Sequence, residues 1–144
     1  MRLAPHPLIY DWNHDAAGPR PVAMLDDETL RDGLQSPSVT DPPIGTKREL
    51  LHHMDRLGIE TANVGLHGAG PRAESDVLDL CREIASSRMA IQANCAARTI
   101  AKDIDPIIRV TQQTGVPIEA CLFIGSSPIR QYAEGWDEEF LVRQ

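Results

Sequence analysis

An arginine and an aspartate, Arg31 and Asp32, stand side by side shortly after a run of apolar residues at 22–25. The run has the composition of a β-strand, so the pair falls where a strand passes into a loop. A carboxylate there can bind a hard divalent cation, and a guanidinium beside it can stabilise an oxyanion. Gly33 lets the backbone turn sharply next to a ligand. The alternative is a surface turn that carries an Arg–Asp ion pair.

The elements that must position this pair alternate between two patterns. Apolar runs predict strands at residues 22–25, 59–66, 89–96 and 118–124, and helical spacing predicts helices at 46–57, 74–85 and 103–114. Asp137 is a candidate cap for a last helix. Alternation of this kind predicts an α/β fold of parallel βα units. Four units make about half of a (β/α)₈ barrel, which needs about 250 residues. An open doubly wound sheet is the alternative, but no Gly-x-Gly-x-x-Gly follows the first strand.

Composition narrows the class of protein. The chain has 144 residues and a net charge of −7, with no basic stripe, so we expect no nucleic-acid partner. No apolar run is long enough for a membrane span, and residues 1–21 form a proline-rich extension without the apolar centre of a signal peptide. Three scattered cysteines, Cys81, Cys95 and Cys121, predict reduced thiols in the cytoplasm, each as a small core residue.

The segment from Asp27 to Gln35 reads Asp-Glu-Thr-Leu-Arg-Asp-Gly-Leu-Gln. It resembles the opening signature of the isopropylmalate synthase family, which includes homocitrate and citramalate synthases and hydroxymethylglutaryl-CoA lyase. Glu28 stands where that family usually has threonine, and Leu34 follows the spelling of the lyase. The resemblance implies that residues 22–144 form the N-terminal half of a TIM-barrel catalytic domain, and therefore an incomplete barrel.

The resemblance also implies roles for residues after the first two strands. Asp32 would bind the divalent metal, Mg²⁺, Mn²⁺ or Zn²⁺, and Arg31 would stabilise the enolate or alkoxide. Gln35 would line the substrate site. Asn63 stands where a glutamate is common, which leaves the identity of the 2-oxo acid open. His67 is a further candidate for substrate contact, although a lone loop histidine is more often solvated.

Two further candidates follow the third and fourth strands. Arg98 suits a substrate carboxylate, and an ion pair in the barrel mouth is the equal alternative. Ser126 could donate a hydrogen bond to a bound acid, or it could cap the next helix. Arg130 replaces a histidine that is frequent in the family. The run from Gly125 to Tyr132 is most similar to isopropylmalate synthases.

We therefore expect an acyltransferase of the leucine-biosynthesis type. It would condense acetyl-CoA with a 2-oxo acid, preferably 2-oxoisovalerate, to a 2-alkylmalate, as a homodimer in the complete protein. The family completes its metal site with a His-x-His pair, and this sequence contains none. We therefore expect an N-terminal fragment with an incomplete site and an open apolar edge at residues 118–124. The alternatives are a hydroxymethylglutaryl-CoA lyase-like enzyme and a non-catalytic half-barrel that associates with another chain.

Overall fold

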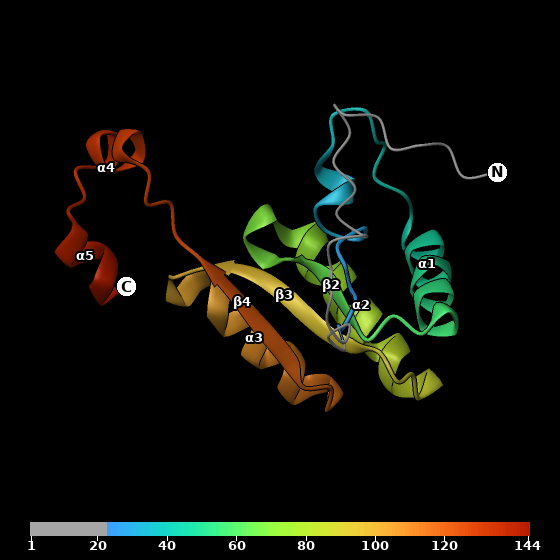
Figure 1. Cartoon of the computed structure of the whole chain (residues 1–144). Coiled ribbons are helices and arrows are strands. Elements are labelled where there is room, and N and C mark those ends of the chain that lie inside the picture. The colour runs from blue at the N-terminus through green and yellow to red at the C-terminus, as the bar shows by residue number, and fades with distance from the viewer. Residues whose placement is uncertain (1–22) are drawn as a thin grey trace, which may run out of the picture.

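The computed structural model describes residues 23–144. Strands and helices alternate along this part of the chain (Figure 1). The elements are β1 (Asp26–Asp27), η1 (Gly33–Gln35), α1 (Ile44–Leu57), β2 (Thr61–Leu66), η2 (His67–Ala69), α2 (Pro71–Ser87), β3 (Gln92–Arg98), α3 (Ala101–Thr114), β4 (Ile118–Phe123), α4 (Pro128–Glu134) and α5 (Glu138–Arg143). The predicted extension at residues 1–21, and Val22 of the first predicted strand, lie outside the described residues.

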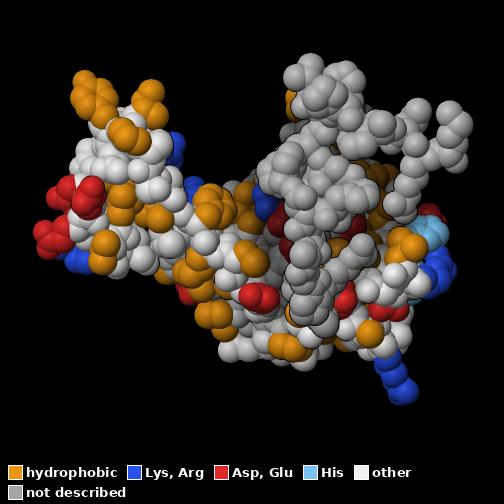
Figure 2. Space-filling view, viewed as in Figure 1, with side chains coloured by type: hydrophobic (Ala, Val, Ile, Leu, Met, Phe, Trp, Pro, Cys, Tyr) orange, Lys and Arg blue, Asp and Glu red, His pale blue; other side chains and the backbone are white. Residues whose placement is uncertain are grey.

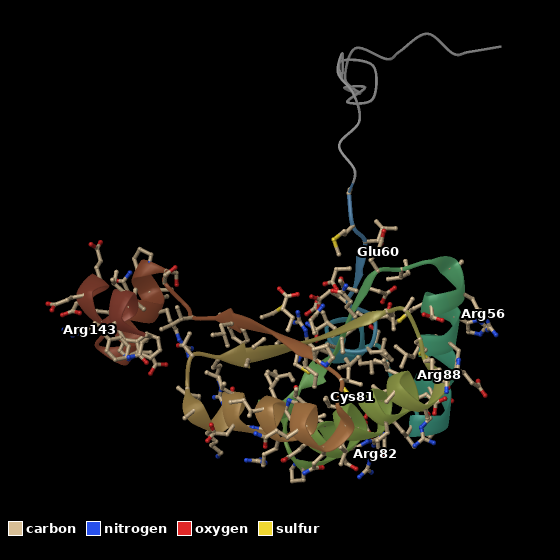
Figure 3. All side chains as sticks on the ribbon, turned by 90° about the horizontal axis from the view of Figure 1, so that it is seen from below. Arg56, Glu60, Cys81, Arg82, Arg88 and Arg143 are labelled. Atoms are coloured by element: carbon tan, nitrogen blue, oxygen red, sulfur yellow. The ribbon has the colours of Figure 1, made fainter. Side chains whose placement is uncertain are left out.

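The four strands form one sheet in the order β1-β2-β3-β4, and every neighbouring pair is parallel. The predicted α/β class with parallel βα units is confirmed. Helices α2 and α3 cover one face of the sheet (Figures 1 and 3). The core lies between the sheet and its helices, where Val64 of β2, Leu51 of α1, and Val77, Leu80 and Cys81 of α2 are almost fully buried. Each buried aliphatic side chain of this size contributes about 1.5–3 kcal/mol to folding.

Helix ends, rather than apolar runs, decide where β2 and β3 begin. Gly58 ends α1 in the left-handed conformation, and the N–H of Ile59 turns back to the carbonyl oxygen of Met54. Ile59 is thereby used in the helix cap, so β2 starts at Thr61 rather than at residue 59. The N–H groups of residues 90 and 91 donate to Oδ1 of Asp55, at 2.9 and 3.3 Å. These two N–H groups are therefore not available for pairing with a neighbouring strand, and β3 starts at residue 92 rather than 89.

The first strand corrects the sequence prediction. Residues 23–25 are not in a strand, and β1 consists only of the next two residues. The carbonyl oxygen of Leu25 accepts from Thr61, but its N–H donates to Oε2 of Glu60 at 2.8 Å. The side chain of Glu60 therefore binds an N–H group that a longer β1 would need for pairing with its neighbour in the sheet. Met24 and Leu25 are 61% and 58% exposed, so these apolar residues do not belong to the core.

The C-terminal elements α4 and α5 form an arm that extends from the end of β4, away from the other helices (Figure 1). Ser127 caps α4 and Asp137 caps α5, so the predicted cap at Asp137 is confirmed. Apolar side chains are exposed on the arm (Figure 2), and the most exposed are Ile129, Tyr132 and Val142.

Strand β4 is mostly exposed. The prediction that all three cysteines are core residues is therefore wrong for Cys121, which β4 leaves exposed, while Cys81 and Cys95 are buried. Within residues 23–144, β4 has a neighbouring strand on one side only. Along residues 23–144, no helix has both the length and the apolar character that a membrane crossing requires.

Candidate functional site

A cavity of about 240 Å³ lies where the loop after β1 meets the end of β2 and the start of α2. Its apolar wall comes mainly from Leu30, Leu34, Val64 and Leu66. Two of the predicted site residues, Arg31 and Gln35, line the same space. Their placement follows from the fold, because parallel strands bring the loops at their C-terminal ends to one edge of the sheet.

Arg31 is fixed by carboxylates on both sides. Its Nη2 lies 2.6 Å from Oε2 of Glu28, and its Nη1 lies 3.0 Å from Oδ1 of Asp32. The Nε of Arg31 is buried and has no partner within the described residues. The two carboxylates therefore hold the guanidinium in one orientation. Glu28, which stands where the resembled family usually has threonine, makes the shorter of these two contacts.

Asp32 faces solvent instead of the cavity. Its side chain is 67% exposed, and one of its oxygens is engaged by Arg31. In the described part of the chain, no three His, Cys, Asp or Glu side chains are grouped as metal ligands. The metal role of Asp32 stays a prediction, and residues 23–144 do not supply a ligand set around it.

Asn63 is buried in the middle of β2 and contacts Glu28, the carboxylate that also holds Arg31. Its Nδ2 donates to Oε1 of Glu28 at 3.4 Å, and its Oδ1 accepts from the N–H of Gly65 at 3.3 Å. In register beside it, Asn94 donates to Oδ1 of Asp26 at 2.7 Å. Because strand residues alternate between faces, these asparagines lie on the face opposite the helix-covered core. Asn63 thus supports Arg31 through Glu28 and does not line the cavity.

His67 is buried rather than solvated, with 6% of its surface exposed. Neither ring nitrogen has a hydrogen-bond partner within the described residues. Burial lowers the pKa of His67 from its usual value, against the opposing charge of Glu74. It lies in η2 at the end of β2 but does not line the cavity with Arg31, so the structure places it near the predicted site and not in it.

Arg98 forms the ion pair that was the alternative to a carboxylate site. Its Nε and Nη2 donate to the two oxygens of Asp103 at 2.7 and 2.8 Å, and its backbone N–H adds a third bond at 3.2 Å. The hydrogen bonds from Arg98 lower the pKa of Asp103. Gly68 lies against the pair, because a Cβ there would come within 2.8 Å of Asp103 Oδ2. The guanidinium of Arg98 is therefore already bound by a carboxylate of the same chain, Asp103.

A second cavity, of about 380 Å³, separates the end of the sheet from the arm. Arg98, Phe123, Arg130 and Trp136 line it. Arg130 lies 3.2 Å from Glu134 and stacks over the Trp136 ring at 5.8 Å. The predicted substrate residue Ser126 is exposed and does not line this cavity.

The predicted residues therefore lie along one edge of the sheet without sharing one cavity. Arg31 and Gln35 face the first cavity, and Arg98 faces the second. Sequence reasoning missed Glu28 as a support for Arg31, and it missed four charged residues in the wall of the first cavity, Asp41, Lys47, Arg72 and Asp76. A signal was present for Lys47, since it stands in the first turn of α1, where a cation opposes the helix dipole and where the helix has no acidic residue.

No protein-family model matches the chain, and no curated protein matches it either.

Proposed function

We propose that this chain belongs to an acyltransferase that condenses acetyl-CoA with a 2-oxo acid, with 2-oxoisovalerate as the preferred acceptor. The proposal adopts the resemblance of residues 27–35 to isopropylmalate synthases and assigns the four βα units to a TIM barrel. The observation that supports it most is the cavity at the C-terminal ends of β1 and β2, in which Arg31 and Gln35 meet an apolar wall.

The proposed reaction creates negative charge beside a ketone. A base removes a proton from the methyl group of acetyl-CoA, and the resulting enolate carbon attacks the ketone carbon of the 2-oxo acid. The ketone oxygen takes up the electron pair and then a proton. Water finally cleaves the thioester and releases CoA and a 2-alkylmalate. The base is not among the residues that we assign.

Arg31 suits the stabilising role in this sequence of steps. Its guanidinium is held by Glu28 and Asp32, and the side chain lines the cavity. A donor that is fixed before the reaction loses little entropy when negative charge develops next to it. Gln35 would contact the acid through its amide, and the surrounding leucines suit an aliphatic side chain.

The resemblance adds a divalent metal with Asp32 as one ligand. Asp32 is exposed and stands without a grouped set of further ligands among residues 23–144. The residues described here therefore do not fit a complete metal site, and none of the steps above depends on one.

The test is release of CoA from acetyl-CoA and 2-oxoisovalerate, with Mg²⁺ or Mn²⁺ present, by the whole product of the reading frame that encodes this chain. Arg31→Ala should lower kcat/KM by about 10²-fold, the typical effect of losing one oxyanion donor. Arg143→Ala, at an exposed arginine of the arm, is the matched control. Lack of 2-oxo-acid-dependent CoA release by the wild type would refute the proposal.

One observation favours the carbon–carbon lyase as a second candidate. Leu34, which follows the lyase spelling, forms part of the cavity wall. The same preparation should be offered hydroxymethylglutaryl-CoA, with acetoacetate and acetyl-CoA as the products to detect. Cleavage of the carbon–carbon bond of hydroxymethylglutaryl-CoA, without any condensation of acetyl-CoA with the 2-oxo acid, would replace the synthase proposal by the lyase.

A further inference from the structure

Lys47 is buried to an extent that is rare for lysine, with 6% of its surface exposed. Its Nζ lies 2.6 Å from Oδ1 of Asp41 and 2.6 Å from Oδ2 of Asp76. Asp41 belongs to the loop between η1 and α1, whereas Asp76 belongs to α2. A single ammonium group therefore joins a loop to two helices.

Arg72 closes this cluster from the side of α2. Its Nη2 lies 2.9 Å from the second oxygen of Asp41 and donates to the carbonyl oxygen of Pro42 at 3.1 Å. The loop at residues 36–43 is thus bound twice at its end, by Lys47 and by Arg72. We call Asp41, Lys47, Arg72 and Asp76 the clasp.

A gain in folding stability alone does not explain the clasp, because burial of Lys47 is costly. Lys47 stands in the first turn of α1, where its charge opposes the helix dipole, and its amine gives up hydration on burial. The carboxylates of Asp41 and Asp76 compensate for that cost. The loop itself contributes exposed residues with little apolar burial, so the clasp supplies most of what holds its end.

The loop runs directly from a wall of the first cavity. Residues Leu34 and Gln35 precede it, and all four clasp residues also line the cavity (in Figure 1, the loop joins the segment after β1 to α1). Movement of residues 36–43 would therefore widen the cavity and shift Gln35. Arg31, which is four residues before Gln35, has its own supports in Glu28 and Asp32.

We propose that the clasp holds the loop at residues 36–43 closed against α1 and α2, and that Lys47 is thereby a positioning residue for the cavity that contains Gln35. The link to substrate binding rests on the proposed function. The structural part, a loop held by Lys47 and Arg72, does not depend on it.

The structural part is tested by hydrogen–deuterium exchange of the full chain. Lys47→Met should speed amide exchange at residues 36–43 by about tenfold, while exchange in β3 changes by less than about twofold. Lys102→Met is the matched control, because Lys102 is the other lysine of the chain and is exposed on α3. Unchanged exchange in the loop, or equal acceleration in loop and β3, would overturn the proposal.

A second variant keeps the test decisive if Lys47→Met does not fold. Arg72→Met removes the contacts to Asp41 and Pro42 from a largely exposed side chain. It should speed exchange in the loop and also increase acetylation of the Lys47 amine by acetic anhydride, while acetylation of Lys102 stays constant. If the reactivity of Lys47 and the exchange of the loop both stay at their wild-type values, there is no clasp.

The functional part is tested in the CoA-release assay. Lys47→Met should raise KM for the 2-oxo acid by about tenfold and change kcat by less than about threefold, because positioning of a binding loop affects mainly ground-state affinity. An unchanged KM with a mobile loop would refute the link to substrate. A wild type without turnover would refute the proposed function and leave the exchange result as the test of the clasp.

Discussion

The side chains of Arg98 and Asp103 bind each other through two hydrogen bonds, of 2.7 and 2.8 Å, across the junction between β3 and α3. Asp103 is 1% exposed, whereas the side chain of Arg98 is 52% exposed. The arginine therefore brings a partner to a carboxylate that would otherwise be buried alone. The pair also fixes the loop at the end of β3, and Gly68 gives it room.

Replacement of Asp103 by Asn should destabilise the protein by about 1–3 kcal/mol, because the charge-assisted bonds to Arg98 are lost in a buried place. Arg98 lowers the pKa of Asp103 in the folded state, so its contribution is complete above the unfolded value of about 3.9 and declines as the pH falls below it. Urea denaturation as a function of pH measures this. Asp105→Asn, at an exposed carboxylate two residues further on, is the control. Equal acid sensitivity of Asp103→Asn and wild type would contradict the assignment.

His67 should make the protein less stable in mild acid. Burial lowers its folded pKa, so the unfolded chain binds a proton more readily. Stability is therefore complete above about pH 6.5 and decreases as the pH falls through that value. His67→Gln should flatten the dependence between about pH 7 and 5, as measured by urea titration. The control is His53→Gln, on the exposed side of α1. A slope that survives His67→Gln would assign the effect to another group.

Thiol titration should separate the three cysteines. Burial raises the pKa of Cys81 to about 12, and it raises the pKa of Cys95 further. Cys121 is exposed on β4, and although burial and Glu119 raise its pKa, it remains the accessible thiol. An aromatic disulfide reagent should label Cys121 in the native protein and all three in denaturant. Native labelling of Cys81 would show that α2 opens from the sheet. Cys121→Ala should abolish the native signal.

The 144-residue chain by itself should show no synthase turnover and should bind divalent metal weakly. No base for the enolate is assigned among its residues. The sequence also has no His-x-His pair, and Asp32 is the one carboxylate of the resembled metal site that it contains. A hard cation needs several ligands for firm binding. Isothermal titration with Mg²⁺ and Mn²⁺, together with the CoA-release assay, measures both properties. Robust turnover by this chain would require a different site from the one proposed.

The outer edge of β4 should promote self-association. Its backbone groups have a neighbouring strand on one side only in the described residues, and Leu122 and Phe123 are each half exposed. Exposed apolar edge strands pair readily with other chains. Leu122→Lys should lower the apparent mass in concentration-dependent sedimentation, and Leu57→Lys on α1 is the matched control at an equally apolar, exposed position. A monomeric wild type at all concentrations would contradict this expectation.

The order of elements could be predicted from local patterns because each pattern has a local physical cause. Val77, Leu80, Cys81 and Ile84 recur at helical spacing, and all four are buried in α2 as that spacing predicts. Gly58 and Gly115 end their helices in the left-handed conformation that glycine adopts easily. Strands and helices that alternate along a chain leave little choice other than a parallel sheet.

Periodicity alone did not decide which apolar residues are inside. Leu57 continues the helical spacing of α1 but is 79% exposed, and Met24 and Leu25 lie outside the core despite their apolar run. Burial depends on which neighbours cover a position, and the sequence does not state where the edge of the sheet lies. The short β1 has the same origin, because Glu60, which is distant in sequence, takes the N–H of Leu25.

The sequence by itself determined which functional side chains stand at the strand ends. Arg31, Asp32 and Gln35 follow β1, and Arg98 is the last residue of β3. Only the tertiary structure decided their partners. It joined Arg31 to Glu28, occupied Arg98 with Asp103, buried His67 between elements, and drew Lys47 between two carboxylates from different segments. A charged side chain takes the partner that lies within reach after folding, and reach in space cannot be read from separation along the chain.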